Sequence, residues 1–323
     1  MIAPDTVPFP IQDEIDSDED GVGFALRMSA ANGITFNRLV RFLATPGHCY
    51  LPAHASGAVA FMFGCDPVRL APSFVSRYFR GGSYGATFQG HHFLRPYHLR
   101  QTRPQVCPCC IEQRLRAHAA WSISLVSSCP IHNTRLLDRC RCGRVLSWRR
   151  PAINLCECGR PLTRTEQSIE PADPREVAIS SQVAYLLGPA HFRLAAPHGM
   201  LHAFDDVTID TYLRLVWAFG VIADDQSKDY PECSSRVLCT EQATLIACRA
   251  FDRLHAVITR SFRQKQVRVC HAALRAIRDD CVSSADFPLV DILMARVSRS
   301  GTGYRERSRS NGHQLSLFGD TDD

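Results

Sequence analysis

The chain has 323 residues, of which 45% are hydrophobic and 21% are charged, and its formal net charge is +5. These values are ordinary for a soluble globular protein, and the length suffices for two or three domains with a substantial core. The longest apolar stretch, GAVAFMFGC, is far shorter than the roughly 20 residues that a membrane span needs, so no membrane partner is expected.

The first 20 residues form an acidic segment, with six carboxylates between Asp13 and Asp20. High charge with little apolar content favours disorder, so residues 1–20 are predicted to be disordered. The segment has the pattern of neither a signal peptide nor a transit peptide. We therefore expect a cytoplasmic protein.

Residues 21–103 are predicted to form a helical N-terminal domain. The stretch GFALRMSAANGITFNRLVRFLA places apolar residues at helical spacing, and Asn32-Gly33 indicates a stop between two short helices. Further along, DPVRLAPSFVSRYF predicts another helix, whereas RGGSYGATFQGHHFL is typical of a loop or hairpin. The glycines of the latter lack the strand and helix that a phosphate-binding loop requires.

Residues 104–165 contain a cluster of potential metal ligands. Eight of the 15 cysteines lie between Cys107 and Cys158, and in a reducing compartment such clustering indicates metal binding. Short spacers within each pair allow a tight turn to aim both side chains at one ion. In sequence order the pairs divide into two zinc sites: site one has Cys107, Cys110, Cys129 and His132, and site two has Cys140, Cys142, Cys156 and Cys158. An interleaved pairing stays open at this stage.

Both zinc ions are predicted to be structural. A catalytic zinc keeps one position open for water, whereas each of these sites has four protein ligands, and neither an H-x-E nor an H-E-x-x-H motif occurs in the chain. No catalytic residue is therefore expected. Cys109, between the ligands of the first pair, should point away from the ion. Gly143 and Gly159 each follow a C-x-C pair, where glycine permits a left-handed turn.

The cysteine region is also the positive part of the chain. Between Arg95 and Arg164 there are 13 arginines and three acids, a net charge of +10, so the remainder of the chain is negative. Such an uneven charge suits the binding of a polyanion. The predicted phosphate contacts of this region are Arg114, Arg116, Arg135, Arg139, Arg141, Arg144, Arg149 and Arg150.

Residues 170–300 are predicted to form a helical C-terminal domain, because five successive stretches carry apolar stripes at helical spacing. Paired acids such as Asp205-Asp206 occur here, but no spacing marks them as a metal-binding catalytic set. A second basic run, from Arg253 to Arg278, contains no acid, and it adds the predicted DNA contacts Arg263, Lys265, Arg268, Arg275 and Arg278. On a helix the last three could share a recognition face. A solvated or partner-binding face is an equally open interpretation.

The predicted flexible tail, residues 301–323, ends close to an apolar pentapeptide, QLSLF. Its residues are Gln314, Leu315, Ser316, Leu317 and Phe318. The pentapeptide resembles the peptide with which bacterial replication and repair proteins dock onto the β sliding clamp. The alternative is that these apolar side chains pack on the chain's own C-terminal domain.

The cysteine region and its flanks resemble the TniQ family of bacterial transposon proteins. The resemblance runs from about Gly23 to Leu162. It rests first on the CPxC knuckle that begins at Cys107 and on Trp121 in the next helix. The remaining motifs are Cys129 and His132 followed by Leu136 and Leu137, and then the two C-x-C-G knuckles. The family often has C-x-x-C where this chain has Cys140-x-Cys142. The resemblance also fits a mainly α fold with a small-β zinc-ribbon module, consisting of a helical N-terminal domain, two zinc knuckle sites and a helical C-terminal domain.

The resemblance implies a function in transposition. Proteins of the family are non-catalytic adaptors that join a target, either DNA or a DNA-bound complex, to a transposon-encoded AAA+ ATPase and its DDE transposase. A zinc-dependent DNA-binding transcription regulator is the alternative interpretation of the same basic module. A third interpretation is an enzyme, for example a nuclease, although the sequence has no catalytic motif for it.

Overall fold

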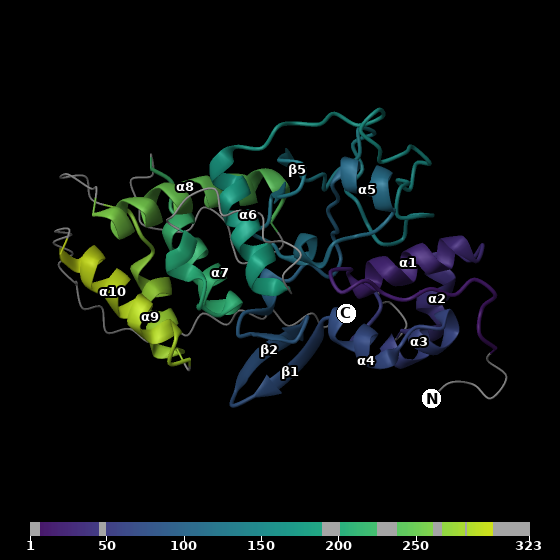
Figure 1. Cartoon of the computed structure of the whole chain (residues 1–323), viewed down its shortest axis with the longest axis horizontal. Helices are drawn as coiled ribbons and strands as arrows, with labels where there is room; N and C mark the ends of the chain where they lie inside the picture. The colour runs from purple at the N-terminus through teal and green to yellow at the C-terminus, as the bar shows by residue number, and fades with distance from the viewer. Residues whose placement is uncertain are drawn as a thin grey trace, which may run out of the picture.

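The computed structural model describes residues 7–44, 50–188, 201–224, 238–260, 267–281 and 283–299. It is mainly helical, with a small antiparallel sheet. Short helices of the N-terminal part lie at one end of the molecule and the longer C-terminal helices lie at the other (Figure 1). In this view the cysteine-rich loops around α5 lie above α1, and the β1–β2 hairpin lies at the lower edge between the two ends. Within these ranges, the longest helices are too polar or too short to cross a membrane.

The N-terminal helices are α1 (Gly21–Ala31), α2 (Phe36–Leu43), α3 (Ser56–Phe63) and α4 (Pro67–Leu70), with 3-10 turns η1 (Ala53–Ala55) and η2 (Ala71–Ser73). The predicted stop between the first two is confirmed: α1 ends before Asn32, and Gly33 has a φ of +69°. Asp20 caps α1 by accepting the backbone N–H groups of Val22 and Gly23, both at 2.9 Å.

A three-stranded antiparallel sheet follows, in the order β1 (Ser76–Arg80), β2 (Ser83–Phe88) and β3 (His91–Phe93), and η3 (Pro96–His98) comes after it. The prediction of a helix for DPVRLAPSFVSRYF is wrong for the second half of this stretch, which forms most of β1. The reason is the Gly81-Gly82 pair: both residues have positive φ, and they close a two-residue hairpin loop that pairs the SRYFR segment with β2.

The middle of the chain has little regular structure. It contains α5 (Pro108–Arg114), η4 (Ala119–Ser122) and a two-stranded ribbon of β4 (Ser128–Cys129) and β5 (Thr134–Arg135). Trp121 lies in the 3-10 turn η4 rather than in an α-helix, and it is buried. Beyond β5 the chain runs through loops and turns to residue 173.

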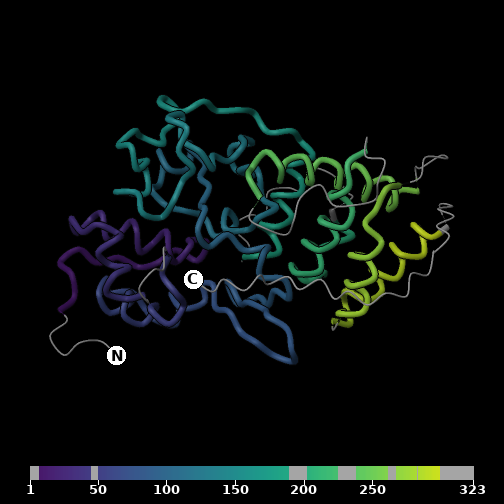
Figure 2. The backbone as a smooth tube through the Cα atoms, turned by 180° about the vertical axis from the view of Figure 1, so that it is seen from behind, coloured from purple at the N-terminus to yellow at the C-terminus, as the bar shows by residue number. Residues whose placement is uncertain are grey.

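The C-terminal helices agree with the predicted stretches. They are α6 (Pro174–Leu187), α7 (Ile209–Gly220), α8 (Thr240–Thr259), α9 (His271–Asp279) and α10 (Asp286–Arg299), with η5 (Leu201–Phe204) before α7. Every residue of α7 is buried, because α6, α8, α9 and β3 all pack against this helix. The tube view shows this helical group at the end of the molecule opposite to α1–α4 (Figure 2).

One cluster of buried apolar side chains extends from Ile15 to Val297, so the parts of the chain share a continuous core. A polar link also joins the cysteine region to the C-terminal helices. The buried Glu176 on α6 accepts hydrogen bonds from Ser127 at 2.8 Å and from Thr244 of α8 at 2.6 Å. A buried carboxylate is tolerated only when its oxygens have such partners.

Candidate metal centres and basic surface

Site one forms where α5 meets the β4–β5 ribbon. Cys107 caps α5 in an extended conformation, with Pro108 at the first helical position, and Cys110 follows one turn later on the same side. Cys129 ends β4, and the loop to β5 turns at Asn133, which has a φ of +51° and donates its N–H to the Cys129 carbonyl at 2.8 Å. The paired backbones of Val106 and Leu137 hold these two ligand pairs opposite one another.

The ligand atoms of site one have the spacing of a four-coordinate ion. His132 Nδ1 lies 3.2 Å from the sulfur of Cys110 and 3.6 Å from the sulfurs of Cys107 and Cys129. The sulfurs of Cys110 and Cys129 lie 3.5 Å apart. A tetrahedral zinc site has edges of about 3.6 Å between nitrogen and sulfur and about 3.8 Å between sulfurs, from its bond lengths. The set could therefore hold a metal ion with small adjustments.

Residues around site one orient its ligands. The other ring nitrogen of His132, Nε2, lies 3.1 Å from Gln113 Oε1, which selects the tautomer that leaves Nδ1 free to bind a metal. Thr134 Oγ1 lies 3.5 Å from the sulfur of Cys107. Neither Gln113 nor Thr134 was predicted from the sequence. The position of Gln113, one helical turn after Cys110, was the available signal for it. Cys109 is not part of the ligand group.

Site two consists of two similar turns, each of the pattern C-x-C-G-R. In the first turn Cys140 donates its N–H to the carbonyl of Arg144 at 2.9 Å and accepts the N–H of Gly143 at 2.8 Å. The second turn repeats both bonds 16 residues later, at 2.9 Å each, with Cys156, Arg160 and Gly159. Gly143 and Gly159 have φ angles of +89° and +83°, as predicted from their positions after the C-x-C pairs.

The two turns bring Cys140, Cys142, Cys156 and Cys158 together, with all ligand atoms within 4.8 Å of one another. Cys140 and Cys156 are buried, and Cys142 and Cys158 are exposed, so this site lies closer to the surface than site one. The buried Gln167 joins the turns: its side-chain oxygen accepts the N–H of Arg141 at 2.9 Å, and its amide donates to the Pro161 carbonyl at 2.6 Å and to the sulfur of Cys140 at 3.7 Å. No sequence signal pointed to this glutamine.

The division of ligands is the one in sequence order, and the interleaved alternative does not occur in the structure. All four ligands of each set are side chains, and they could hold one metal ion each. Site one is largely buried, and site two is open on the side of its two exposed cysteines.

The family model of TniQ matches residues 10–136. This segment is therefore similar to the TniQ family. No curated protein matches the chain. The matched segment contains all four candidate ligands of site one, whereas site two lies beyond its end. The departure of Cys140-x-Cys142 from the family pattern therefore falls outside the matched residues.

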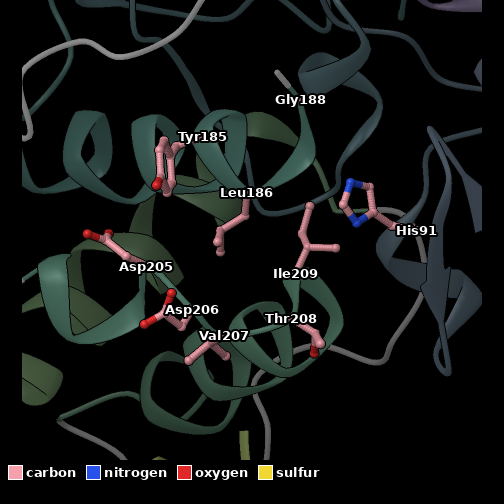
Figure 3. Close-up of a pocket in the computed structure, with 9 residues that line it drawn as sticks. All are labelled: His91, Tyr185, Leu186, Gly188, Asp205, Asp206, Val207, Thr208 and Ile209. Atoms are coloured by element: carbon pink, nitrogen blue, oxygen red, sulfur yellow. The ribbon is translucent and has the colours of Figure 1, made fainter. Parts of the chain in front are cut away.

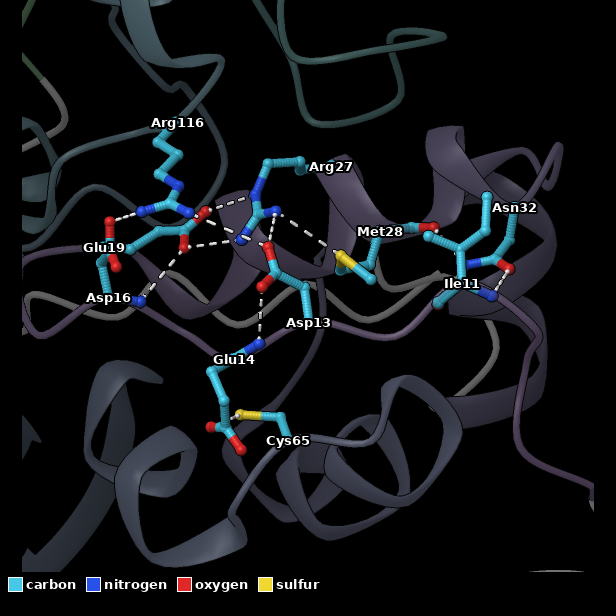
Figure 4. Close-up of polar contacts among 10 residues, drawn as sticks. All are labelled: Ile11, Asp13, Glu14, Asp16, Glu19, Arg27, Met28, Asn32, Cys65 and Arg116. Carbon is cyan, nitrogen blue, oxygen red and sulfur yellow. Dashed lines mark hydrogen bonds and ion pairs between the residues drawn. The ribbon is translucent and has the colours of Figure 1, made fainter.

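The prediction of disorder for the acidic segment is wrong from residue 7 onward, where the structure describes the chain. The family match, which begins at residue 10, includes most of this ordered part. Arg27 binds Asp13 at 2.7 Å and Glu19 at 2.9 Å, and Arg116 pairs with Asp16 (Figure 4). His118 Nδ1 lies 2.9 Å from a carboxylate oxygen of Asp18. Basic groups distant in sequence thus neutralise the acids. The disorder prediction failed because it considered only the composition of the segment itself and not these partners.

The arginines predicted to contact DNA have different environments. The prediction that Arg150 contacts DNA at the surface is wrong, because this side chain is 1% exposed and stacks on Trp148. Arg116 pairs with the acidic segment, and Arg135 pairs with Glu170, so both already have carboxylate partners. Those that lie exposed on the surface are Arg114, Arg139, Arg141, Arg144 and Arg149, of which Arg144 lies 3.8 Å from Glu157.

The second basic run is only partly described. Arg263 and Lys265 lie outside the described residues. Arg268 precedes the start of α9 at His271, so it does not share a helical face with Arg275 and Arg278. Arg278 binds Asp291 of α10 at 3.0 Å. The tail residues Gln314 to Phe318 also lie outside the described residues.

A pocket of about 460 Å³ lies between α6, β3 and the turn before α7 (Figure 3). His91, Tyr185 and the acids Asp205 and Asp206 are among its lining residues. Asp205 is engaged with His202 at 3.0 Å, and His91 Nε2 lies 2.9 Å from the Leu187 carbonyl. Among the residues that the structure describes, no predicted metal or DNA-binding residue lines this pocket.

Proposed function

We propose that this protein is a non-catalytic target-selection adaptor of transposition in the bacterial cytoplasm. It binds target DNA, or a complex on DNA, and recruits the AAA+ ATPase and the DDE transposase of its transposon. The observation that carries the proposal is the TniQ match over residues 10–136, a segment that contains a complete four-ligand site beside exposed arginines.

Two structural zinc ions complete the proposed adaptor. Three thiolates with one imidazole, and four thiolates, are the ligand sets that zinc prefers in closed structural sites. In site one the ion would join α5 to the β4–β5 ribbon, and in site two it would join the two C-x-C-G-R turns. Because these segments have little regular secondary structure, the ions would supply much of the stability that holds the arginines in place.

Exposed arginines of the cysteine region support DNA binding. Arg114 lies on α5, and Arg139, Arg141 and Arg149 lie on or next to the first C-x-C-G-R turn. Phosphate contacts of this kind release counterions, so affinity should fall steeply as salt rises. We further propose that the tail residues Gln314, Leu315, Ser316, Leu317 and Phe318 dock onto the β sliding clamp, through burial of the leucines and the phenylalanine.

The test combines the full-length zinc-loaded protein, the AAA+ ATPase of the proposed transposon and labelled duplex DNA in a pull-down assay. The expected result is recovery of the ATPase with the protein, strengthened by DNA. An Arg114→Gln, Arg141→Gln variant should recover less DNA, at unchanged zinc content. Specific DNA binding with no recovery of the ATPase would contradict the adaptor and favour the transcription regulator.

A further inference from the structure

The β1–β2 hairpin projects from the body of the molecule. In both views it extends from the lower edge, whereas α5 and the cysteine-rich loops lie toward the upper edge (Figures 1 and 2). The base of the hairpin is anchored in the core by Ala86 and Phe88, which are buried, and β2 pairs with β3. The outer half therefore stands in solvent on a fixed base.

The outer half of the hairpin combines aromatic and basic side chains. Phe79 and Tyr84 face each other across the strands, with their ring centroids 4.7 Å apart, and they are 62% and 57% exposed. Because side chains alternate along a strand, Arg77 lies on the same face as Phe79, and Arg80 lies on the other face next to the turn. The turn itself is Gly81-Gly82, so no side chain shields the tip.

Along the chain, the segment that contains the hairpin has charge of one sign. No acidic residue occurs between Asp66 and Glu112, and this interval contains six arginines. Arg77 and Arg80 are exposed, and in the described part of the chain neither has an ion-pair partner. Arg27 and Arg116, in contrast, are neutralised by the acidic segment. The hairpin is thus a positively charged projection whose charge is available to a partner.

We propose that the β1–β2 hairpin is a second DNA-contacting element, separate from the cysteine region. A two-stranded ribbon fits the major groove of duplex DNA, arginines neutralise the flanking phosphates, and an exposed aromatic pair can pack on sugars or base edges. The glycine tip allows close approach to the duplex. A protein partner fits less well, because two exposed rings are a small apolar area for a specific interface.

This inference rests on the proposed DNA binding, and charge substitutions test it in the full-length zinc-loaded protein. The variant is Arg77→Gln, Arg80→Gln. Its matched control is Arg38→Gln, Arg41→Gln on α2, where two exposed arginines have the same spacing. Affinity for a 30-base-pair duplex is measured by fluorescence anisotropy at several salt concentrations, and circular dichroism and zinc content verify folding.

The expected result is at least a tenfold loss of affinity for the hairpin variant, with the slope of log affinity against log salt reduced by about two. The control should lose less than threefold. A Phe79→Ser, Tyr84→Ser variant should bind more weakly with an unchanged slope, since it removes no charge. If it loses hairpin structure, the arginine variant decides the question.

Three outcomes overturn the inference. Wild-type affinity in the hairpin variant, together with loss in Arg114→Gln, Arg141→Gln, would leave the proposed function standing and exclude the hairpin. Unchanged DNA affinity with loss of the ATPase in the pull-down would make the hairpin a protein interface. Absence of DNA binding by the wild-type protein, with or without the ATPase, would contradict both the inference and the proposed DNA binding.

Discussion

At the scale of single residues, burial and direction separate side chains of the same type. Cys109 and Cys110 are adjacent on α5, yet only Cys110 has its sulfur in the ligand group of site one. The 100° rotation between neighbouring helical positions is sufficient to aim one thiol at the ion and the other away from it. Arg150 and Arg149 differ in a similar way: the first is buried against Trp148, and the second is exposed.

Metal counting on purified variants tests this separation. Cys110→Ser should lose one zinc ion per chain, because it removes one of four ligands, whereas Cys109→Ser should retain two. Elemental analysis after desalting measures both, with wild-type protein as the reference. Loss of an ion from Cys109→Ser, or retention of two by Cys110→Ser, would contradict the ligand assignment of site one.

At the scale of elements, the two C-x-C-G-R turns share a geometry that requires glycine. The φ angles near +85° at Gly143 and Gly159 lie in a region that other residues enter at a cost of about 1–2 kcal/mol. Neither glycine is crowded, since a Cβ atom would meet nothing within 4 Å at either position. The requirement is therefore one of backbone conformation alone.

A glycine-to-alanine comparison isolates this requirement. Gly143→Ala should lower the free energy of unfolding by about 1–2 kcal/mol and speed the loss of metal from site two to a chelator. Gly57→Ala is the control: Gly57 lies in α3 with open space around it and no positive φ, so alanine there should stabilise the protein by up to about 1 kcal/mol. Equal effects of the two substitutions in urea unfolding would argue against a conformational origin.

At the scale of the whole molecule, buried polar groups connect parts of the chain that are distant in sequence. Asp138, next to site two, accepts the N–H of Thr240 at the start of α8 at 2.8 Å. Asp210 of α7 accepts the N–H of Leu94 after β3 at 2.9 Å, and burial raises the pKa of this aspartate to about 6. The raised pKa of Asp210 makes the global stability sensitive to pH.

Among the buried groups, His98 should have the clearest pH effect. Burial, with Arg214 and Arg95 nearby, lowers its pKa from 6.5 to about 3, so it stays neutral in the folded state. Below pH 6.5 the unfolded chain takes up a proton there and the folded chain does not, which lowers the free energy of unfolding as pH falls. Burial also raises the pKa of Glu19, to about 7. Glu19 and Asp210 therefore act in the opposite direction and raise the free energy of unfolding as pH falls.

Urea unfolding of the wild type and of His98→Gln at pH 7.0 and pH 5.5 separates the histidine from the acids. The wild type should lose about 1 kcal/mol more than the variant over this interval, from the difference in proton uptake. Unfolding at pH 8, where the histidine is neutral in both states, serves as the reference. Parallel pH dependences of the two proteins would show that His98 does not contribute.

The helices and the ligand groups followed from local rules, and for this reason they could be predicted. The apolar stripes of α6 to α10 and the stop at Asn32-Gly33 depend on residues a few positions apart. The assignment of β1 failed because its pairing with β2 depends on a glycine turn beyond its own end. The acidic segment failed because its partners, Arg27, Arg116 and His118, belong to other elements.

The sequence by itself indicated the similarity to the TniQ family, the helical character of both ends and the eight potential ligand positions. The helices and ligand positions could be predicted because spacing along the chain constrains turns and helices directly. Tertiary structure alone decided which arginines are exposed, how the ligand pairs divide between two sites and where the β1–β2 hairpin projects. Burial and charge neutralisation arise from contacts between residues that are far apart in sequence. Arg116 against Asp16 and Arg135 against Glu170 are two such contacts, and neither leaves a local pattern.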